Sequence, residues 1–128
     1  MERLAYPIVL TKDKDAYLVY VPDFQIDTFG KDIADALEMA RDAIGLMAMQ
    51  LQDEGKKVPD PGTMEVEKEE DDILLYVDIC FDEYRIKNDS RKVRKNVTIP
   101  YYLNLRAEKM GINFSRVLED ALATKIGY

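Results

Sequence analysis

The chain contains 128 residues, 47% of them apolar, which is enough for one ordinary domain or two small ones with a hydrophobic core. Cys80 is the only cysteine and histidine is absent, so an internal disulfide, the usual zinc sites and histidine-based catalysis are excluded. No apolar run approaches the roughly 18 residues that span a bilayer, and the first residues lack the basic and apolar regions of an export signal. We therefore expect a soluble cytoplasmic protein with no membrane partner.

The net charge of −7 is divided unevenly along the chain. Residues 1–90 contain 10 Lys and Arg against 22 Asp and Glu, a net charge of −12, whereas residues 91–128 contain 8 against 3, a net charge of +5. An acidic body followed by a basic end indicates two different partners, one cationic and one anionic.

The first thirty residues predict three strands. Two aromatic and β-branched runs, at residues 6–10 and 17–21, flank the polar turn of residues 12–15 and predict a β-hairpin. Residues 24–29 predict a third, shorter strand, which Gly30 closes.

One long helix follows, with Asp32 as its N-cap and Gly55 beyond its last turn. Its apolar residues recur at steps of three and four, as expected for a helix with one buried face; they are Ile33, Leu37, Ala40, Ile44, Met47 and Leu51. Residues 73–81 then alternate strictly and predict a further strand. The combination is an α+β domain over residues 1–87, in which one helix packs across one antiparallel sheet.

Residues 88–92 have the composition of a linker, and residues 93–128 predict a second, smaller domain. Apolar and polar residues alternate over residues 93–99, which is the period of a half-buried strand, and Pro100 ends it. Two helical segments follow, joined by a hinge at residues 110–113.

The hinge supplies Gly111 as the C-cap of the first helix and Asn113 as the N-cap of the second. A short strand followed by two helices cannot bury its own apolar faces, so we expect this domain to pair with a second copy of itself. The side chains expected in the dimer face are Val97, Ile99, Leu103, Phe114, Val117, Leu118 and Leu122. Whether such dimers join further into tetramers stays open.

The polar face of the strand predicts contact with DNA. Two such strands, paired antiparallel across a two-fold axis, form a ribbon that fits the major groove, where Arg94, Asn96 and Thr98 would reach base edges. Lys92 and Lys95 suit phosphates, and so do the free backbone N–H groups at the start of the second helix. The alternative is a solvated edge strand whose charges only prevent aggregation.

The C-terminal residues resemble a ribbon-helix-helix DNA-binding domain. The resemblance rests on the alternating strand, the proline at helix entry and the Gly-x-Asn-x-Ser hinge. In that family the outward strand residues read bases and the start of the second helix holds a phosphate. Carried over to this chain, these roles fall on Arg94, Asn96, Thr98, Asn113 and Ser115.

The N-terminal residues resemble the HicB antitoxin family. The matching features are Tyr-Pro-Ile-Val-Leu at residues 6–10, Tyr-Leu-Val-Tyr-Val-Pro-Asp-Phe at residues 17–24, Gly30 before an Asp-x-x-Asp-Ala-Leu-Glu-x-Ala helix start, and Pro59. Many members carry a Gly-Cys-x-Thr-x-Gly turn where this sequence has residues 25–30.

This second resemblance implies a pared-down ribonuclease H-like fold and an antitoxin role. HicB proteins neutralise HicA, a small ribonuclease toxin that cleaves messenger RNA, and usually repress their own operon through the C-terminal domain. For this chain the resemblance implies a HicA-type toxin and operator DNA as partners, with steric and electrostatic occlusion of the toxin. It implies no catalytic residue and no cofactor.

Two alternatives from other classes stay open. A metal-dependent nuclease would use carboxylates on or beside the predicted strands, namely Asp13, Asp15, Asp23, Asp27, Asp78 and Asp82. Two-metal catalysis needs several carboxylates to converge on ions about 4 Å apart, whereas turns favour Asp for backbone reasons. We expect no metal site, and interpret the acidic residues as a counter-surface for a cationic toxin. The other alternative is a stand-alone transcription regulator whose N-terminal domain senses a small molecule.

Overall fold

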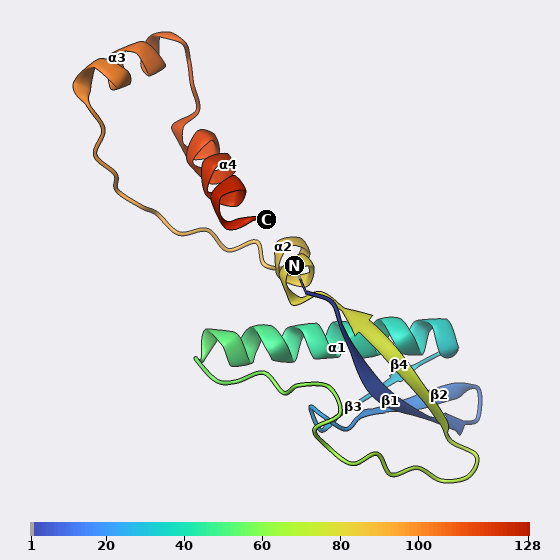
Figure 1. Cartoon of the computed structure of the whole chain (residues 1–128). Helices are drawn as coiled ribbons and strands as arrows, with labels where there is room; N and C mark the ends of the chain where they lie inside the picture. The colour runs from blue at the N-terminus through green and yellow to red at the C-terminus, as the bar shows by residue number, and fades with distance from the viewer. Residues whose placement is uncertain (1) are drawn as a thin grey trace. The chain divides into compact units, whose positions relative to one another are not determined.

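The structure is a computed structural model that describes residues 2–128, and these form two compact units. We call them the N-terminal unit, Glu2–Asp89, and the C-terminal unit, Ser90–Tyr128. In chain order the elements are β1 (Leu4–Asp13), β2 (Ala16–Val21), β3 (Ile26–Gly30), α1 (Ile33–Asp53), β4 (Ile73–Ile79), α2 (Phe81–Asn88), α3 (Tyr101–Lys109) and α4 (Phe114–Ile126) (Figure 1). No helix of the described residues is long and apolar enough to cross a membrane.

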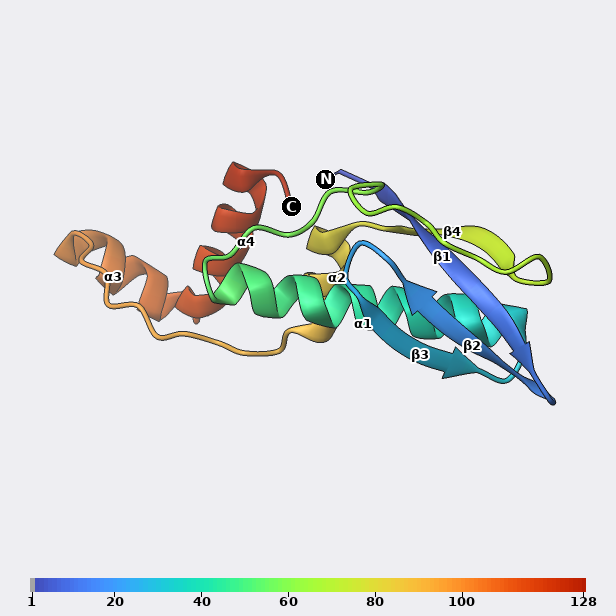
Figure 2. The same ribbon diagram turned by 90° about the horizontal axis from the view of Figure 1, so that it is seen from below.

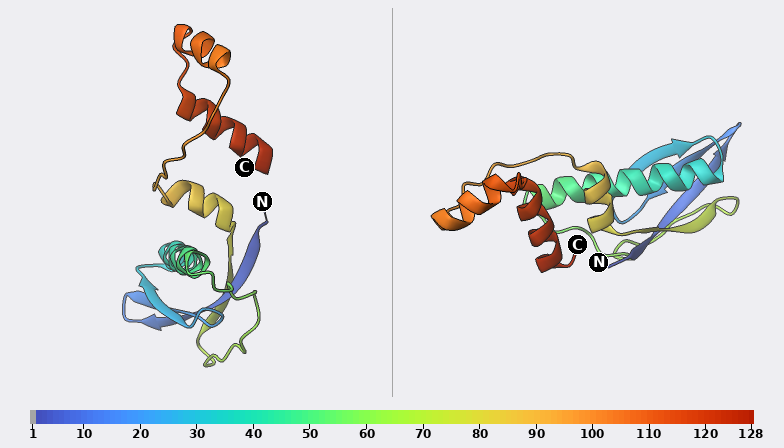
Figure 3. Two further views of the ribbon diagram at one scale, coloured as in Figure 1. Left: turned by 90° about the vertical axis from the view of Figure 1, so that its left-hand side faces the viewer. Right: turned by 90° about the horizontal axis from the view of Figure 1, so that it is seen from above.

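The N-terminal unit is a four-stranded antiparallel sheet in the order β3-β2-β1-β4. Helix α1 lies along one face of this sheet, and within the unit the opposite face carries no helix (Figures 2 and 3). The core lies between α1 and the sheet. Its buried side chains are Tyr6, Ile8 and Leu10 of β1, Val19 and Val21 of β2, Val77 and Ile79 of β4, and Ala36, Ala40 and Ile44 of α1.

Both predicted ends of α1 are confirmed. Asp32 accepts a hydrogen bond from the backbone N–H of Asp35 at 2.8 Å, which satisfies one of the donors left free in the first turn. Gly55 takes a φ of 71°, and the chain reverses there because the Lys56 N–H bonds back to the Leu51 carbonyl at 2.8 Å.

The buried stripe of α1 uses smaller residues than the sequence pattern predicts. Ala36, Ala40, Ile44 and Ala48 are at most 1% exposed, whereas Ile33 is 41% exposed. The helix runs close to β3: a Cβ built on Gly30 would lie 2.4 Å from the Ala36 nitrogen. Backbone atoms cannot move aside as a flexible side chain can, so only glycine fits at this contact.

The sequence does not predict helix α2. β4 ends at Ile79, and residues 81–88 are helical instead of continuing the strand to Phe81. The helix is held by contacts with residues distant in sequence. The Tyr84 ring packs so closely on Gly45 of α1 that a Cβ added at Gly45 would lie 2.5 Å from the ring. Arg85 donates to the Met49 carbonyl at 3.3 Å and to Gln52 Oε1 at 2.8 Å. The N-terminal unit therefore contains a second helix, packed against α1.

The turn before β3 has Gln25 where many members of the family that the sequence resembles have glycine. Gln25 has a φ of 53°, in the left-handed region that favours glycine, and its N–H bonds to the Pro22 carbonyl at 3.2 Å. Gln25 therefore holds a turn conformation that glycine would adopt more easily, at some cost in backbone strain.

The C-terminal unit contains the two predicted helices and the predicted N-cap Asn113, whereas the C-cap of α3 is Met110 and Gly111 is the residue after it. Asn113 accepts a hydrogen bond from the Arg116 N–H at 3.1 Å, and Gly111 has a φ of 67°. Residues 91–100 form neither helix nor strand in the single chain. A strand needs a hydrogen-bonded neighbour, and the strand predicted at residues 93–99 is one that pairs with a second copy.

Candidate nucleic-acid interface and dimerisation face

The C-terminal unit has no core of its own. From residue 90 to residue 128 no side chain is buried, although the segment contains many large apolar residues. Val97 is 66% exposed, Val117 55% and Leu122 53%. Complete burial of one such side chain lowers the free energy by up to about 1.5–3 kcal/mol. The unit therefore presents apolar surface that another surface must cover.

Six of the seven residues predicted for the dimer face line one apolar groove of about 580 Å³. They are Val97, Ile99, Leu103, Phe114, Val117 and Leu118, from the extended segment, α3 and α4. The groove is completed by Lys95, Asn104, Ala107, Ile112, Ser115 and Ala121, and Leu122 is exposed outside it. The chain thus brings together residues that the sequence separates by up to 21 positions, from Val97 to Leu118.

Three of the residues predicted to contact DNA share a second recess. Lys92, Arg94 and Ser115 line it together with Val93, in a volume of about 460 Å³. The recess places two cationic side chains beside the first turn of α4, where backbone N–H groups have no partner within the helix. This arrangement suits an anionic oxygen such as that of a phosphate.

The remaining predicted DNA-contacting residues lie elsewhere. Asn96 and Thr98 are exposed and line neither recess. Lys95 lines the apolar groove with Val97 and Ile99, because every second residue of an extended segment points to the same side. Asn113 uses its side-chain oxygen to cap α4, so its contribution to a phosphate site would come from orienting the helix start.

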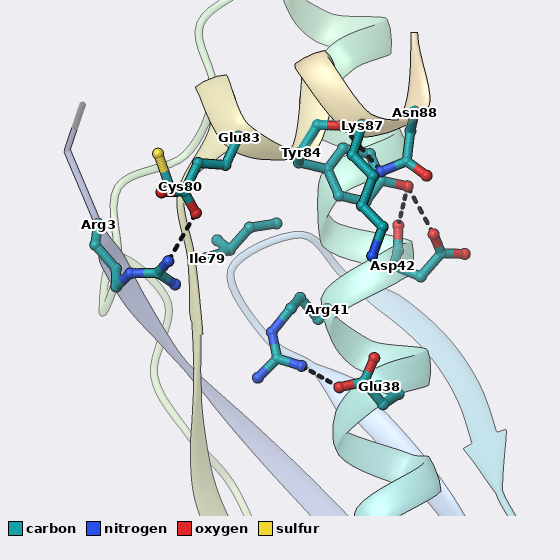
Figure 4. A pocket seen from close by; sticks show the side chains of 10 residues that line it. All are labelled: Arg3, Glu38, Arg41, Asp42, Ile79, Cys80, Glu83, Tyr84, Lys87 and Asn88. Atoms are coloured by element: carbon teal, nitrogen blue, oxygen red, sulfur yellow. Dashed lines mark hydrogen bonds and ion pairs between the residues drawn. The ribbon is translucent and has the colours of Figure 1, made fainter. Parts of the chain in front are cut away.

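The N-terminal unit has a recess of about 260 Å³ between α1, α2 and β4, which contains charges of both signs (Figure 4). Arg3 pairs with Glu83 at 2.8 Å and with Asp78 at 3.0 Å. Arg41 pairs with Glu38 and also binds Asp78, and its hydrogen bond lowers the pKa of the Asp78 carboxyl below the ordinary value. These charges satisfy one another and fasten β4 to α1 and to the N-terminus.

Tyr84 fixes α2 in the same recess. Its hydroxyl donates to Asp42 Oδ1 at 2.7 Å (Figure 4). Burial, followed by this hydrogen bond to a carboxylate, raises the pKa of the Tyr84 hydroxyl above its ordinary value. The recess is therefore a structural junction between the two helices.

The aspartates considered for metal catalysis do not converge. Among the residues that the structure describes, no three Asp, Glu or Cys side chains are placed to hold a metal ion. Asp23 is only 5% exposed and accepts hydrogen bonds from the Gly62 N–H at 2.9 Å, the Thr63 hydroxyl at 3.1 Å and the Met64 N–H at 2.9 Å. Its role is to anchor the loop between α1 and β4. Beyond the Pro-Asp pair, no sequence signal indicates this role, because the partners lie about forty residues away.

Replacing Asp23 with alanine should lower the free energy of unfolding by about 1–3 kcal/mol, because it removes a buried carboxylate that accepts three hydrogen bonds from the loop at residues 62–64. Urea titration of the full chain measures the change. The control is Asp27→Ala on the exposed side of β3, which should change stability by less than about 0.5 kcal/mol. Equal stability of the two variants would contradict the anchoring role of Asp23.

Comparison with known families decides the identity of the chain. The model of the HicB-like antitoxins of bacterial toxin–antitoxin systems matches residues 6–117. This chain belongs to the HicB-like antitoxin family. The match includes the sheet, α1, α2, α3 and the start of α4, so it extends well beyond the N-terminal motifs. A comparison with curated proteins finds no match.

Solved structures share the fold over almost the whole chain. A chain of a toxin–antitoxin complex from Streptococcus pneumoniae is 24% identical, with a TM-score of 0.57 over 97% of this chain and 99% of that chain. The antitoxin HicB3 is 26% identical, with a TM-score of 0.53 over 96% and 98%. The antitoxin HicB of Burkholderia pseudomallei is 24% identical, with a TM-score of 0.53 over 93% and 96%. The α+β fold class predicted from the sequence is confirmed.

Proposed function

We propose that this HicB-like antitoxin binds and neutralises a HicA-type ribonuclease toxin that cleaves messenger RNA, and that it represses its own operon by binding operator DNA. The match to the antitoxin family over residues 6–117 is the observation that carries the proposal. The chain performs no chemistry in this mechanism. It covers the active surface of the toxin.

The charge of the N-terminal unit supports a cationic protein partner. Residues 1–90 carry a net charge of −12, and a ribonuclease that grips RNA needs a basic surface. Opposite charges on the two proteins accelerate their encounter and disfavour wrong partners. The acidic charge therefore supports a cationic toxin as the partner of this unit.

The C-terminal unit supports the second role, in which it acts as a homodimer. Its exposed apolar groove is covered when two copies associate, and the two extended segments then pair as an antiparallel ribbon. Arg94, Asn96 and Thr98 would face the bases of the major groove. Lys92, Lys95 and the start of α4, at Asn113 and Ser115, would contact phosphates.

The experiment that tests this function is co-expression with the reading frame adjacent to the chain's own gene. The neighbouring product alone should arrest growth, co-expression should restore it, and the two proteins should copurify. The control is co-expression with the C-terminal unit alone, residues 90–128, which should not restore growth. A harmless neighbouring product, or growth arrest that the full chain does not relieve, would refute the antitoxin assignment.

A further inference from the structure

The face of the sheet opposite α1 presents exposed apolar side chains from β2, β3 and β4. Side chains alternate between the two faces along each strand, so the residues between the core positions point away from α1. Val9 of β1 is paired with Tyr20 of β2 on one side and with Leu74 of β4 on the other. Leu18 of β2 is paired in turn with Phe29 of β3. The registers therefore place these side chains next to one another.

Five large side chains form this surface, which we call the sheet patch. They are Leu18 at 50% exposure, Tyr20 at 38%, Phe29 at 64%, Leu74 at 38% and Tyr76 at 64%. Val9, which the registers place between Tyr20 and Leu74, is only 4% exposed. Exposed apolar surface that mixes aromatic and aliphatic side chains is typical of protein interaction sites.

The border of the sheet patch is acidic. Asp27 is paired with Tyr20 in the register of β2 and β3, and its side chain is exposed. Asp72 is hydrogen-bonded to Thr11, which lies on this face. It is the last residue of a run at residues 65–72 that contains six acidic residues and one lysine. Asp78 also borders the patch, but Arg3 and Arg41 balance its charge. The net charge around the apolar centre is therefore negative.

This combination selects among the possible occupants. Nucleic acid is disfavoured because its phosphates would meet carboxylates. A second copy of the chain would bring two acidic borders together, and like charges at an interface oppose association. A small ligand would need a concave site, and none of the three recesses described above is lined by the five residues of the patch. A protein with an apolar centre and a basic border fits both features.

We propose that the sheet patch is the docking surface for the basic toxin, with Phe29 and Tyr76 as its aromatic anchors and Asp27 and the acidic run of residues 65–72 as its electrostatic border. This inference rests on the proposed function. It adds the location of the toxin interface on the N-terminal unit and the chemistry by which the toxin is recognised.

The test measures binding of the purified full chain to the protein encoded by the adjacent reading frame. The double variant Phe29→Lys and Tyr76→Lys should weaken binding by roughly 30-fold or more, because it removes two anchors and sets cations against a basic surface. Both side chains are 64% exposed, so the fold should persist, which a circular dichroism spectrum and a melting curve verify. The matched control is Leu46→Lys with Ile86→Lys, at residues that are 54% and 57% exposed on α1 and α2.

A second variant, Asp27→Asn, tests the border without changing the apolar centre. It should slow association severalfold and reduce the dependence of the association rate on salt. Unchanged binding by the patch double variant, or loss of binding only in the control double variant, would overturn the docking surface. A patch variant whose native mass falls while toxin binding persists would overturn it too, since a second copy would then cover the patch. Failure of the unmodified chain to bind the neighbouring product would instead refute the proposed function.

Discussion

Replacing Leu118 with lysine should halve the native mass of the protein, which we propose to dimerise through its C-terminal unit, and should abolish binding to operator DNA. Leu118 lines the apolar groove of a unit in which no side chain from residue 90 to residue 128 is buried. A charge in the centre of the dimer face would have to be buried without a partner, which costs more than association gains. The monomer would then present a single extended segment where the ribbon needs two.

The expected loss of operator affinity is roughly 100-fold or more, because the two half-sites are no longer bound by linked copies. The added lysine would itself attract phosphates, so its charge alone would raise the affinity for DNA and cannot explain a loss of affinity. Ile126→Lys is the matched control, since it places the same charge on α4 at a residue that is 64% exposed and outside the groove. Light scattering after gel filtration gives the mass, and a mobility-shift titration with the upstream DNA gives the affinity. A Leu118→Lys protein that stays dimeric and binds DNA normally would contradict the dimer face.

Features set by local chemistry could be predicted from the sequence. The ends of α1 and the start of α4 follow from Asp32, Gly55 and Asn113, each of which satisfies backbone groups within a few residues of itself. The hairpin of β1 and β2 follows from two alternating runs around a polar turn, in which Lys14 has a φ of 56°. These signals do not depend on the rest of the fold.

Features set by distant contacts could not be predicted. Residues 81–88 show no helical period of apolar residues. Their helix is held in place because the Tyr84 ring packs on Gly45 and because Arg85 donates hydrogen bonds to the last turns of α1. The alternation of residues 73–81 continues past the end of β4 because Phe81 still packs against the core from the first turn of α2. Asp23 belongs to the same class, since its partners are in the loop at residues 62–64.

The candidate site falls between these two classes. The sequence predicts which apolar residues of the C-terminal unit share a face, and the groove gathers six of the seven. It also predicts a strand at residues 93–99, which remains unpaired in a single chain. The hydrogen bonds of that strand depend on a second molecule, so neither the sequence nor the isolated fold contains its partner.

Replacing Arg94 and Asn96 with alanine should abolish operator binding and leave toxin neutralisation intact. A bidentate contact from Arg to guanine or from Asn to adenine is worth about 1–3 kcal/mol of discrimination, and each residue occurs twice in a dimer. Without these four side chains, the affinity should fall to that for unrelated DNA, a change of roughly 10³-fold or more. Neither substitution touches the core of the N-terminal unit, so the toxin interface should persist.

The matched controls separate base reading from charge. Arg106→Ala removes a cation from α3, outside the extended segment of residues 93–99, and should change operator affinity much less. Lys92→Ala should weaken binding to all DNA sequences equally, and the slope of affinity against salt should fall by about one unit for each phosphate that the variant no longer neutralises. Mobility-shift titrations with operator and scrambled DNA measure both effects, and the growth assay with the neighbouring gene measures neutralisation. Loss of toxin neutralisation in a folded Arg94→Ala and Asn96→Ala protein would contradict the assignment of operator binding and neutralisation to separate units. The strand at residues 93–99 would then be part of the toxin interface.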